Sequence, residues 1–159
     1  MATTGNTQVQ KGIPVIQDAF VVIVKTEWNS EIVHKLEKSA RTLLKQQGIR
    51  VATLTVPGAF EIPFTVKQHY TYAKQVPDAY ITLGAVIRGG TPHFEYVCQA
   101  VTEGIVLLNQ QLDVPVIFGV LTLDNLAQAR ERTGGAEGDK GAEAAITAIK
   151  MIALNRKLQ

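Results

Sequence analysis

Short apolar runs alternate with longer amphipathic stretches along this chain. The short runs cover residues 19–24, 51–56, 79–83 and 114–120. Each is almost continuously hydrophobic, which is typical of strands buried on both faces of a parallel sheet. Between the runs, apolar residues recur at helical spacing, for example at Ile32, Val33, Leu36, Ala40, Leu43 and Leu44.

The helical spacing and the capping residues predict five helices. The first begins after an N-cap at Asn29 or Ser30 and ends before Gly48. Two further helices are expected over residues 61–73 and 92–112. A short helix capped by Asp124 should run to Arg132, and the last helix covers residues 141–154.

This alternation predicts an α/β fold of three layers, in which helices flank a four-stranded parallel sheet with right-handed crossovers. A flavodoxin-like strand order of 2-1-3-4 is expected. With no break in composition, residues 1–159 form one domain, of which residues 1–14 are a flexible N-terminal arm. Pro14 allows at most an edge strand in that arm.

Composition and charge exclude several classes of protein. Of the 159 residues 46% are hydrophobic, which excludes a disordered chain. The net charge of +2 is too small to indicate a nucleic-acid partner, and the charged fraction of 19% favours a homo-oligomer. The single cysteine, Cys98, excludes an intrachain disulfide. Without a membrane span or a signal segment, we expect a soluble cytoplasmic protein.

Ligands of open parallel sheets bind beyond the carboxyl ends of the strands, so the loops there carry the candidate chemistry. Gly89 and Gly90 precede Thr91, a good N-cap, and Pro92, a good first helical residue. Amides at such a helix start favour phosphate, and His93 beside them is a candidate proton carrier. A tight strand-to-helix turn with no ligand explains these residues at least as well.

Other candidates at this edge also have two interpretations. Trp28, the only tryptophan, could stack on a planar heterocycle or cap the core of the sheet. Glu61 could complement a helix dipole or accept hydrogen bonds from substrate hydroxyls. His34 and His69 lie in helical stretches and are expected to face solvent.

Four segments resemble the hallmarks of the lumazine synthase family, in order and with the family's spacing: residues 57–63, 84–97, 115–122 and 132–141. The family condenses 5-amino-6-(D-ribitylamino)uracil with 3,4-dihydroxy-2-butanone 4-phosphate. The product is 6,7-dimethyl-8-ribityllumazine, with phosphate and water released, and the reaction is the penultimate step of riboflavin synthesis. The resemblance implies no metal and no organic cofactor, because the substrate's own amine forms the Schiff base.

The resemblance also implies a role for each matching residue. His93 matches the proton-transfer residue. The substrate-binding positions on the same chain are Trp28, Asn29, Ala59, Phe60, Glu61, Ala85, Val86, Ile87, Gly90 and Thr91. Trp28 would stack on the pyrimidine, residues 59–61 would hold the ribityl chain, residues 85–87 would offer backbone contacts, and Gly90 and Thr91 would bind the phosphate.

Three further positions match residues that a neighbouring subunit supplies in the family: Phe118, which covers the pyrimidine, Arg132, which pairs with the phosphate, and Lys140. The implied partners are therefore the two small substrates and other copies of this chain, in a pentamer or in a sixty-subunit shell of pentamers. Riboflavin synthase is a further candidate partner. Neither nucleic acid nor a membrane is expected.

One loop departs from the family pattern, because Ala136 replaces a lysine and Glu137 and Asp139 make it acidic. A catalytically weak shell or flavin-binding relative is therefore the alternative function. A receiver domain is excluded, because the first and third strands lack terminal acidic residues for a divalent ion. An electron-transfer flavodoxin is excluded, because no phosphate loop follows the first strand.

Overall fold

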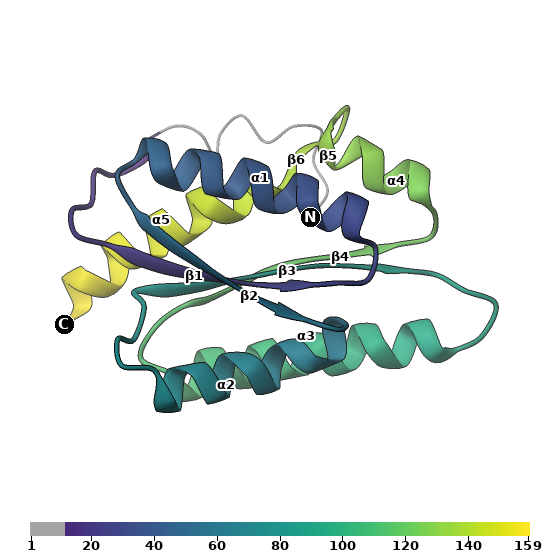
Figure 1. Ribbon diagram of the computed structural model, residues 1–159, viewed down its shortest axis with the longest axis horizontal. Helices are drawn as coiled ribbons and strands as arrows, with labels where there is room; N and C mark the ends of the chain where they lie inside the picture. Colours follow the sequence, from purple (N-terminus) through teal and green to yellow (C-terminus); the bar gives the residue numbers. More distant parts are fainter. Residues whose placement is uncertain (1–11) are drawn as a thin grey trace.

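The computed structural model describes residues 12–159 and has three layers (Figure 1). A parallel sheet in the order β2-β1-β3-β4 forms the middle layer, which confirms the predicted fold class and strand order. Helices α1 and α5 cover one face of the sheet, and α2 and α3 cover the other. The four strands of this sheet are β1 (Phe20–Thr26), β2 (Arg50–Val56), β3 (Ala79–Ile87) and β4 (Val116–Leu123).

The five helices follow the order predicted from the sequence. They are α1 (Ser30–Gln46), α2 (Ile62–Tyr72), α3 (His93–Gln111), α4 (Leu126–Glu131) and α5 (Lys140–Leu158), with a 3₁₀ turn, η1, over Ala59–Glu61. Gly48 follows α1 with a φ of 73°, the left-handed conformation expected of a C′ glycine. A small hairpin of β5 (Thr133–Gly135) and β6 (Gly138–Asp139), absent from the prediction, joins α4 to α5.

The continuous apolar runs are explained by burial on both sides. Val21 and Ile23 of β1 pack into the cluster under α1 and α5, while Val22 and Val24 pack into the cluster under α2 and α3. Neither face of the strand meets water, so polar residues need not alternate with apolar ones.

The ends of two strands differ from the prediction. Strand β3 continues through residues 84–87, beyond the predicted run of residues 79–83, because these residues pair with residues 120–123 of β4. Strand β4 begins at Val116 and ends at Leu123, so Phe118 is its third residue. The predicted run of residues 114–120 would have placed Phe118 near the carboxyl end of the strand, and this expectation is wrong.

The predicted cap of the short helix α4 is also wrong by one residue. Asn125, rather than Asp124, caps α4, because its side chain accepts a hydrogen bond from the Gln128 backbone amide. The last helix is capped by Asp139, whose carboxylate accepts hydrogen bonds from the amides of Gly141 and Ala142. Asp139 also accepts a hydrogen bond from Ser39 on α1, so this acidic departure from the family pattern has a structural use.

Residues 1–11 of the predicted arm lie outside the described residues. Nearer the sheet, Ile13 and Ile16 pack against the cluster under α1 and α5. Among the described helices, none is long and apolar enough to span a membrane.

Candidate active site

A pocket of about 460 Å³ lies at the carboxyl edge of β1 and β3, between the start of α3 and η1. Its walls come from four separate segments of the chain, which the strand ends bring together. Nine predicted site residues line it: Trp28, Asn29, Ala59, Phe60, Glu61, Ala85, Val86, Ile87 and His93.

Trp28 forms an open wall of this pocket. Its side chain is 66% exposed, so the interpretation as an aromatic that caps the core is wrong. The indole lies against Gly58, where a Cβ atom would stand only 2.7 Å from Cζ3 of the ring. Since Gly58 has extended backbone, a side chain there would be limited by the close approach of the indole, which would have to move, and not by an unusual φ.

Asn29 links two walls of the pocket, the β1–α1 turn and the end of β3. It adopts the left-handed conformation, with a φ of 58°, and its side-chain nitrogen donates to the Ala85 carbonyl over 2.7 Å. The amide group is thus used to hold the β1–α1 turn against the end of β3. This contact also occupies a lone pair of one backbone carbonyl that the family resemblance assigns to the pyrimidine.

Glu61 is half-buried and ends η1. Its Oε2 accepts a hydrogen bond from the Gly58 amide over 3.0 Å, which closes the loop between β2 and α2. This local role satisfies one oxygen of the carboxylate and fixes the direction of the group. Binding of a substrate hydroxyl by Glu61 stays a prediction.

His93 lines the pocket from the first residue of α3. The residue before the helix is Pro92, with φ −62° and ψ −1°, so the prediction of Thr91 as N-cap is wrong. The turn-like ψ of Pro92 delays the regular helix by one residue. The first helical amides that lack an intrahelical acceptor therefore belong to His93 and Phe94, and Gly90 and Thr91 lie in the exposed loop before them.

The other three predicted site residues lie elsewhere on the described chain. Phe118 and Lys140 line a separate cavity of about 410 Å³ between β4 and α5. The Lys140 ammonium pairs with Glu143, with nitrogen–oxygen distances of 3.0 and 2.9 Å. Arg132 follows α4, where it donates to the Gln128 carbonyl over 3.0 Å and lies 3.6 Å from the carboxylate of Glu131.

Two pocket residues and one paired carboxylate were not predicted from the sequence. Thr26, at the end of β1, lines the pocket and donates from its hydroxyl to the Trp28 carbonyl over 3.2 Å. Val97 lines it one helical turn after His93, a spacing that could have identified it. Glu143 could have been found in the same way, three residues after Lys140 on α5.

No group of three metal-ligating side chains is present among residues 12–159. The pocket is instead lined mainly by apolar and aromatic groups, with a histidine, an asparagine and a carboxylate at its rim. A concave, largely apolar site with a few convergent polar groups suits a small organic ligand with a planar part. Fold and pocket together define an α/β ligand-binding protein whose site lies at the carboxyl edge of a parallel sheet.

Comparison with known proteins narrows this class to one family. The 6,7-dimethyl-8-ribityllumazine synthase family matches residues 18–156. Proteins named 6,7-dimethyl-8-ribityllumazine synthase are similar over most of their length. The one from Parabacteroides distasonis is 45% identical over 88% of each chain. The one from Christiangramia forsetii is 43% identical over 98% of this chain and 96% of its own. The chain belongs to the 6,7-dimethyl-8-ribityllumazine synthase family.

Proposed function

We propose that this chain catalyses the condensation of 5-amino-6-(D-ribitylamino)uracil with 3,4-dihydroxy-2-butanone 4-phosphate. The reaction gives 6,7-dimethyl-8-ribityllumazine, phosphate and water, in riboflavin biosynthesis. The observation that carries the proposal is the pocket at the carboxyl edge, in which Trp28, Glu61 and His93 meet on a chain of this family.

The pyrimidine substrate fits the apolar part of the pocket. The exposed indole of Trp28 offers a flat surface on which the heterocycle stacks. The strand end at residues 85–87 offers backbone groups to the edge of the ring. Glu61, fixed by the Gly58 amide, accepts hydrogen bonds from the ribityl hydroxyls, and Ala59 and Phe60 line the wall beside that chain.

The protein's contribution is positioning and proton transfer. The substrate amine attacks the ketone and forms a Schiff base with loss of water, and the phosphate is then eliminated. The second nitrogen attacks the remaining carbonyl and closes the ring with loss of water. His93, exposed at the pocket rim in the first turn of α3, accepts and returns protons during these steps. Gly90 and Thr91 bind the phosphate through the loop before α3, where the helix dipole favours an anion.

Phe118, Arg132 and Lys140 act on the pocket of a neighbouring copy. Two observations support this arrangement: all three lie outside their own chain's described pocket, and Phe118 is 44% exposed on β4. Covered by a neighbour, the aromatic ring closes the open side of the pyrimidine site, and the Arg132 guanidinium pairs with phosphate. A cyclic homo-oligomer follows, a pentamer or a shell of pentamers, in the cytoplasm, with riboflavin synthase as a further partner.

A turnover assay tests the proposed function. Purified protein is mixed with both substrates, and lumazine fluorescence and phosphate release are followed against an enzyme-free control, because the condensation also proceeds slowly unaided. Product formation well above the control supports the proposal. No acceleration by correctly assembled protein contradicts it and favours a shell or flavin-binding protein that has lost catalysis.

A further inference from the structure

Arg88, the residue after β3, is the centre of a polar cluster at the base of the glycine-rich loop. Its Nε donates to the Asp124 carboxylate over 2.9 Å, and a terminal nitrogen makes a short hydrogen bond to Glu95. The guanidinium carbon also lies 4.2 Å from the centre of the Phe94 ring. One side chain thereby contacts two residues of the first turn of α3 and one residue after β4.

These contacts close the loop that carries the proposed phosphate site. Residues 89–92 leave the sheet at Arg88 and return to it through α3, and the contacts from Arg88 to Phe94 and Glu95 join the two ends. A Cβ atom at Gly89 or Gly90 would meet no other atom within 4 Å, so packing at these two positions does not order the loop. Such a loop loses binding affinity to ordering entropy unless its ends are fixed.

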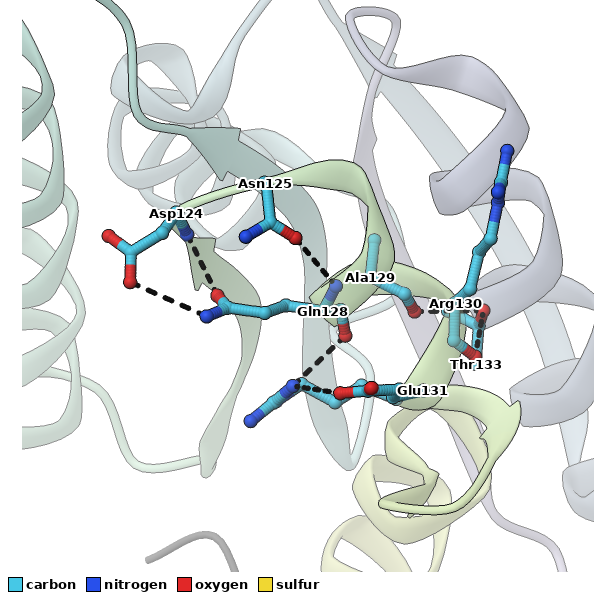
Figure 2. Close-up of polar contacts among 8 residues, drawn as sticks. Asp124, Asn125, Gln128, Ala129, Arg130, Glu131 and Thr133 are labelled. Atoms are coloured by element: carbon cyan, nitrogen blue, oxygen red, sulfur yellow. Dashed lines mark hydrogen bonds and ion pairs between the residues drawn. The ribbon is translucent and has the colours of Figure 1, made fainter.

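A second arm of the cluster leads to Arg132. Figure 2 shows the Asp124 side chain facing Gln128 on α4. The Gln128 amide donates to the Asp124 carboxylate over 3.4 Å and accepts from the Asp124 backbone over 2.8 Å. The Gln128 carbonyl then accepts from the Arg132 guanidinium over 3.0 Å. A continuous series of polar contacts therefore runs from the glycine-rich loop to the proposed phosphate arginine.

The charges of Arg88, Glu95 and Asp124 indicate how Arg88 acts in this cluster. The hydrogen bonds that Arg88 donates to Glu95 and Asp124 raise the pKa of Arg88 and lower the pKa of both carboxyls. All three groups are charged at neutral pH, and their formal charges sum to about −1. Because two carboxylates bind its guanidinium, the positive charge of Arg88 is already neutralised within the cluster. Arg88 therefore does not act as a free cation for the substrate.

We propose that Arg88 is a positioning residue for the phosphate-bearing substrate: it orders the glycine-rich loop through Phe94 and Glu95 and holds α4, which ends at Arg132, through Asp124 and Gln128. The inference rests on the proposed function, which places phosphate at these elements. It assigns Arg88 a role in the affinity for phosphate and leaves the pyrimidine wall, built by Trp28 and Glu61, unaffected.

The test compares Arg88→Met, which keeps the aliphatic stem, with Arg88→Lys, which keeps the charge. Lys35→Met is the matched control, because Lys35 forms an ion pair of similar exposure with Glu31 on α1, away from the loop. For each protein, KM for both substrates, kcat and the affinity for inorganic phosphate are measured, the last by calorimetric titration without turnover.

We expect Arg88→Met to raise KM for the butanone phosphate and the Kd of inorganic phosphate roughly tenfold, since it removes two exposed ion pairs and a cation–π contact. KM for the pyrimidine should stay within about twofold of wild type, and Arg88→Lys should recover part of the loss. Equal changes in both KM values, or an unchanged Kd for phosphate, would overturn the proposal, as would the same change in Lys35→Met.

Failure of the positioning role is distinguishable from failure of the proposed function. If the wild type forms no lumazine, the proposed function fails, and the phosphate titration alone still decides whether Arg88 controls phosphate affinity. If the wild type forms lumazine while Arg88→Met binds phosphate normally, only the positioning role is wrong.

Discussion

Two regions of this molecule carry predicted site residues, and they are built differently. The first is the pocket at the carboxyl edge, where four segments of one chain meet around Trp28, Glu61 and His93. The second is the surface formed by Phe118 and Lys140 on β4 and α5, together with Arg132 after α4. The first region is a pocket with walls from one chain, whereas none of the residues of the second region lines that pocket.

The difference shows which part of a site one chain can organise by itself. In the first region, backbone contacts fix the functional groups, such as the bonds from Asn29 to Ala85 and from Gly58 to Glu61. In the second, the cations are held by neighbours on their own helix, Arg132 by Gln128 and Lys140 by Glu143. Under the proposed arrangement, a complete site combines the first region of one copy with the second region of another. The following predictions separate the two contributions.

The largest effect is expected from Arg132→Ala in the second region. Loss of a guanidinium that pairs with phosphate should lower kcat/KM for the butanone phosphate by about 100-fold or more. KM for the pyrimidine should change little, because the pyrimidine wall belongs to the first region. Steady-state kinetics with each substrate varied in turn measures both quantities, kcat/KM for the butanone phosphate and KM for the pyrimidine. Arg132→Lys shows how much of the loss depends on the planar guanidinium group. Equal losses of kcat/KM for both substrates would contradict the pairing of Arg132 with the phosphate.

In the first region, His93→Ala should reduce kcat by up to about 100-fold, because proton transfer then falls to water. The oligomer should persist, since a side chain exposed at the first position of α3 contributes little packing. Rates and sedimentation of the same preparation measure the two effects. An unchanged kcat would exclude His93 from the mechanism.

Gly141→Ala tests the close contact between α1 and α5, next to Lys140 of the second region. A Cβ atom at Gly141 would stand 2.2 Å from the Leu36 carbonyl oxygen, so α1 and α5 must separate. We expect a loss of about 2 kcal/mol in the free energy of unfolding, measured by urea titration. Lys67→Ala on the exposed face of α2 is the control and should change stability by less than about 0.5 kcal/mol. Equal stability of the two variants would contradict the close contact.

Trp28→Ala should raise KM for the pyrimidine about tenfold and leave KM for the butanone phosphate unchanged, the opposite selectivity to Arg132→Ala. Trp28→Phe should retain most of the affinity, because a flat ring remains. Gly58→Ala should act like a mild form of Trp28→Ala, since the new methyl group displaces the indole. A normal pyrimidine KM in Trp28→Ala would show that the indole does not stack on the ring.

The smallest effect is expected away from both regions, at His69, which makes a 2.8 Å hydrogen bond to the buried Tyr80. Burial lowers the pKa of His69, so the native state favours the neutral ring. The contribution of this residue to stability is therefore present above its unfolded pKa of about 6.5 and is lost as pH falls through the native value. Thermal unfolding against pH should show a shallower acid decline in His69→Gln. KM values should not change, which makes this variant a baseline.

The sequence was sufficient for much of the first region because one rule, ligand binding beyond the carboxyl ends of parallel strands, brings distant segments to one edge. It could not decide between stacking and core packing for Trp28, because that depends on the approach of the indole to Gly58. It was wrong about His69, which is half-buried against Tyr80 rather than facing solvent. That contact joins α2 to β3 and has no signal in local periodicity.

The site residues of the second region could be predicted only from the family resemblance. Periodicity places Arg132 and Lys140 at helix ends, where exposed cations are ordinary. The register of β4 against β3 decides that Phe118 stands away from the carboxyl edge, and sequence alone did not supply that register. The contacts of Arg88 could not be predicted from the sequence, because its partners lie far apart along the chain: Glu95 in the first turn of α3 and Asp124 directly after β4.

Mixing the two inactive variants tests the central claim, that a working site combines the first region of one copy with the second region of another. His93→Ala and Arg132→Ala are unfolded together, reassembled in equal amounts and assayed. If copies assemble at random, about one quarter of the pockets receive both intact residues, so about one quarter of wild-type activity should return. Activity no greater than that of the separate variants, in assemblies proven to be mixed, would contradict the account.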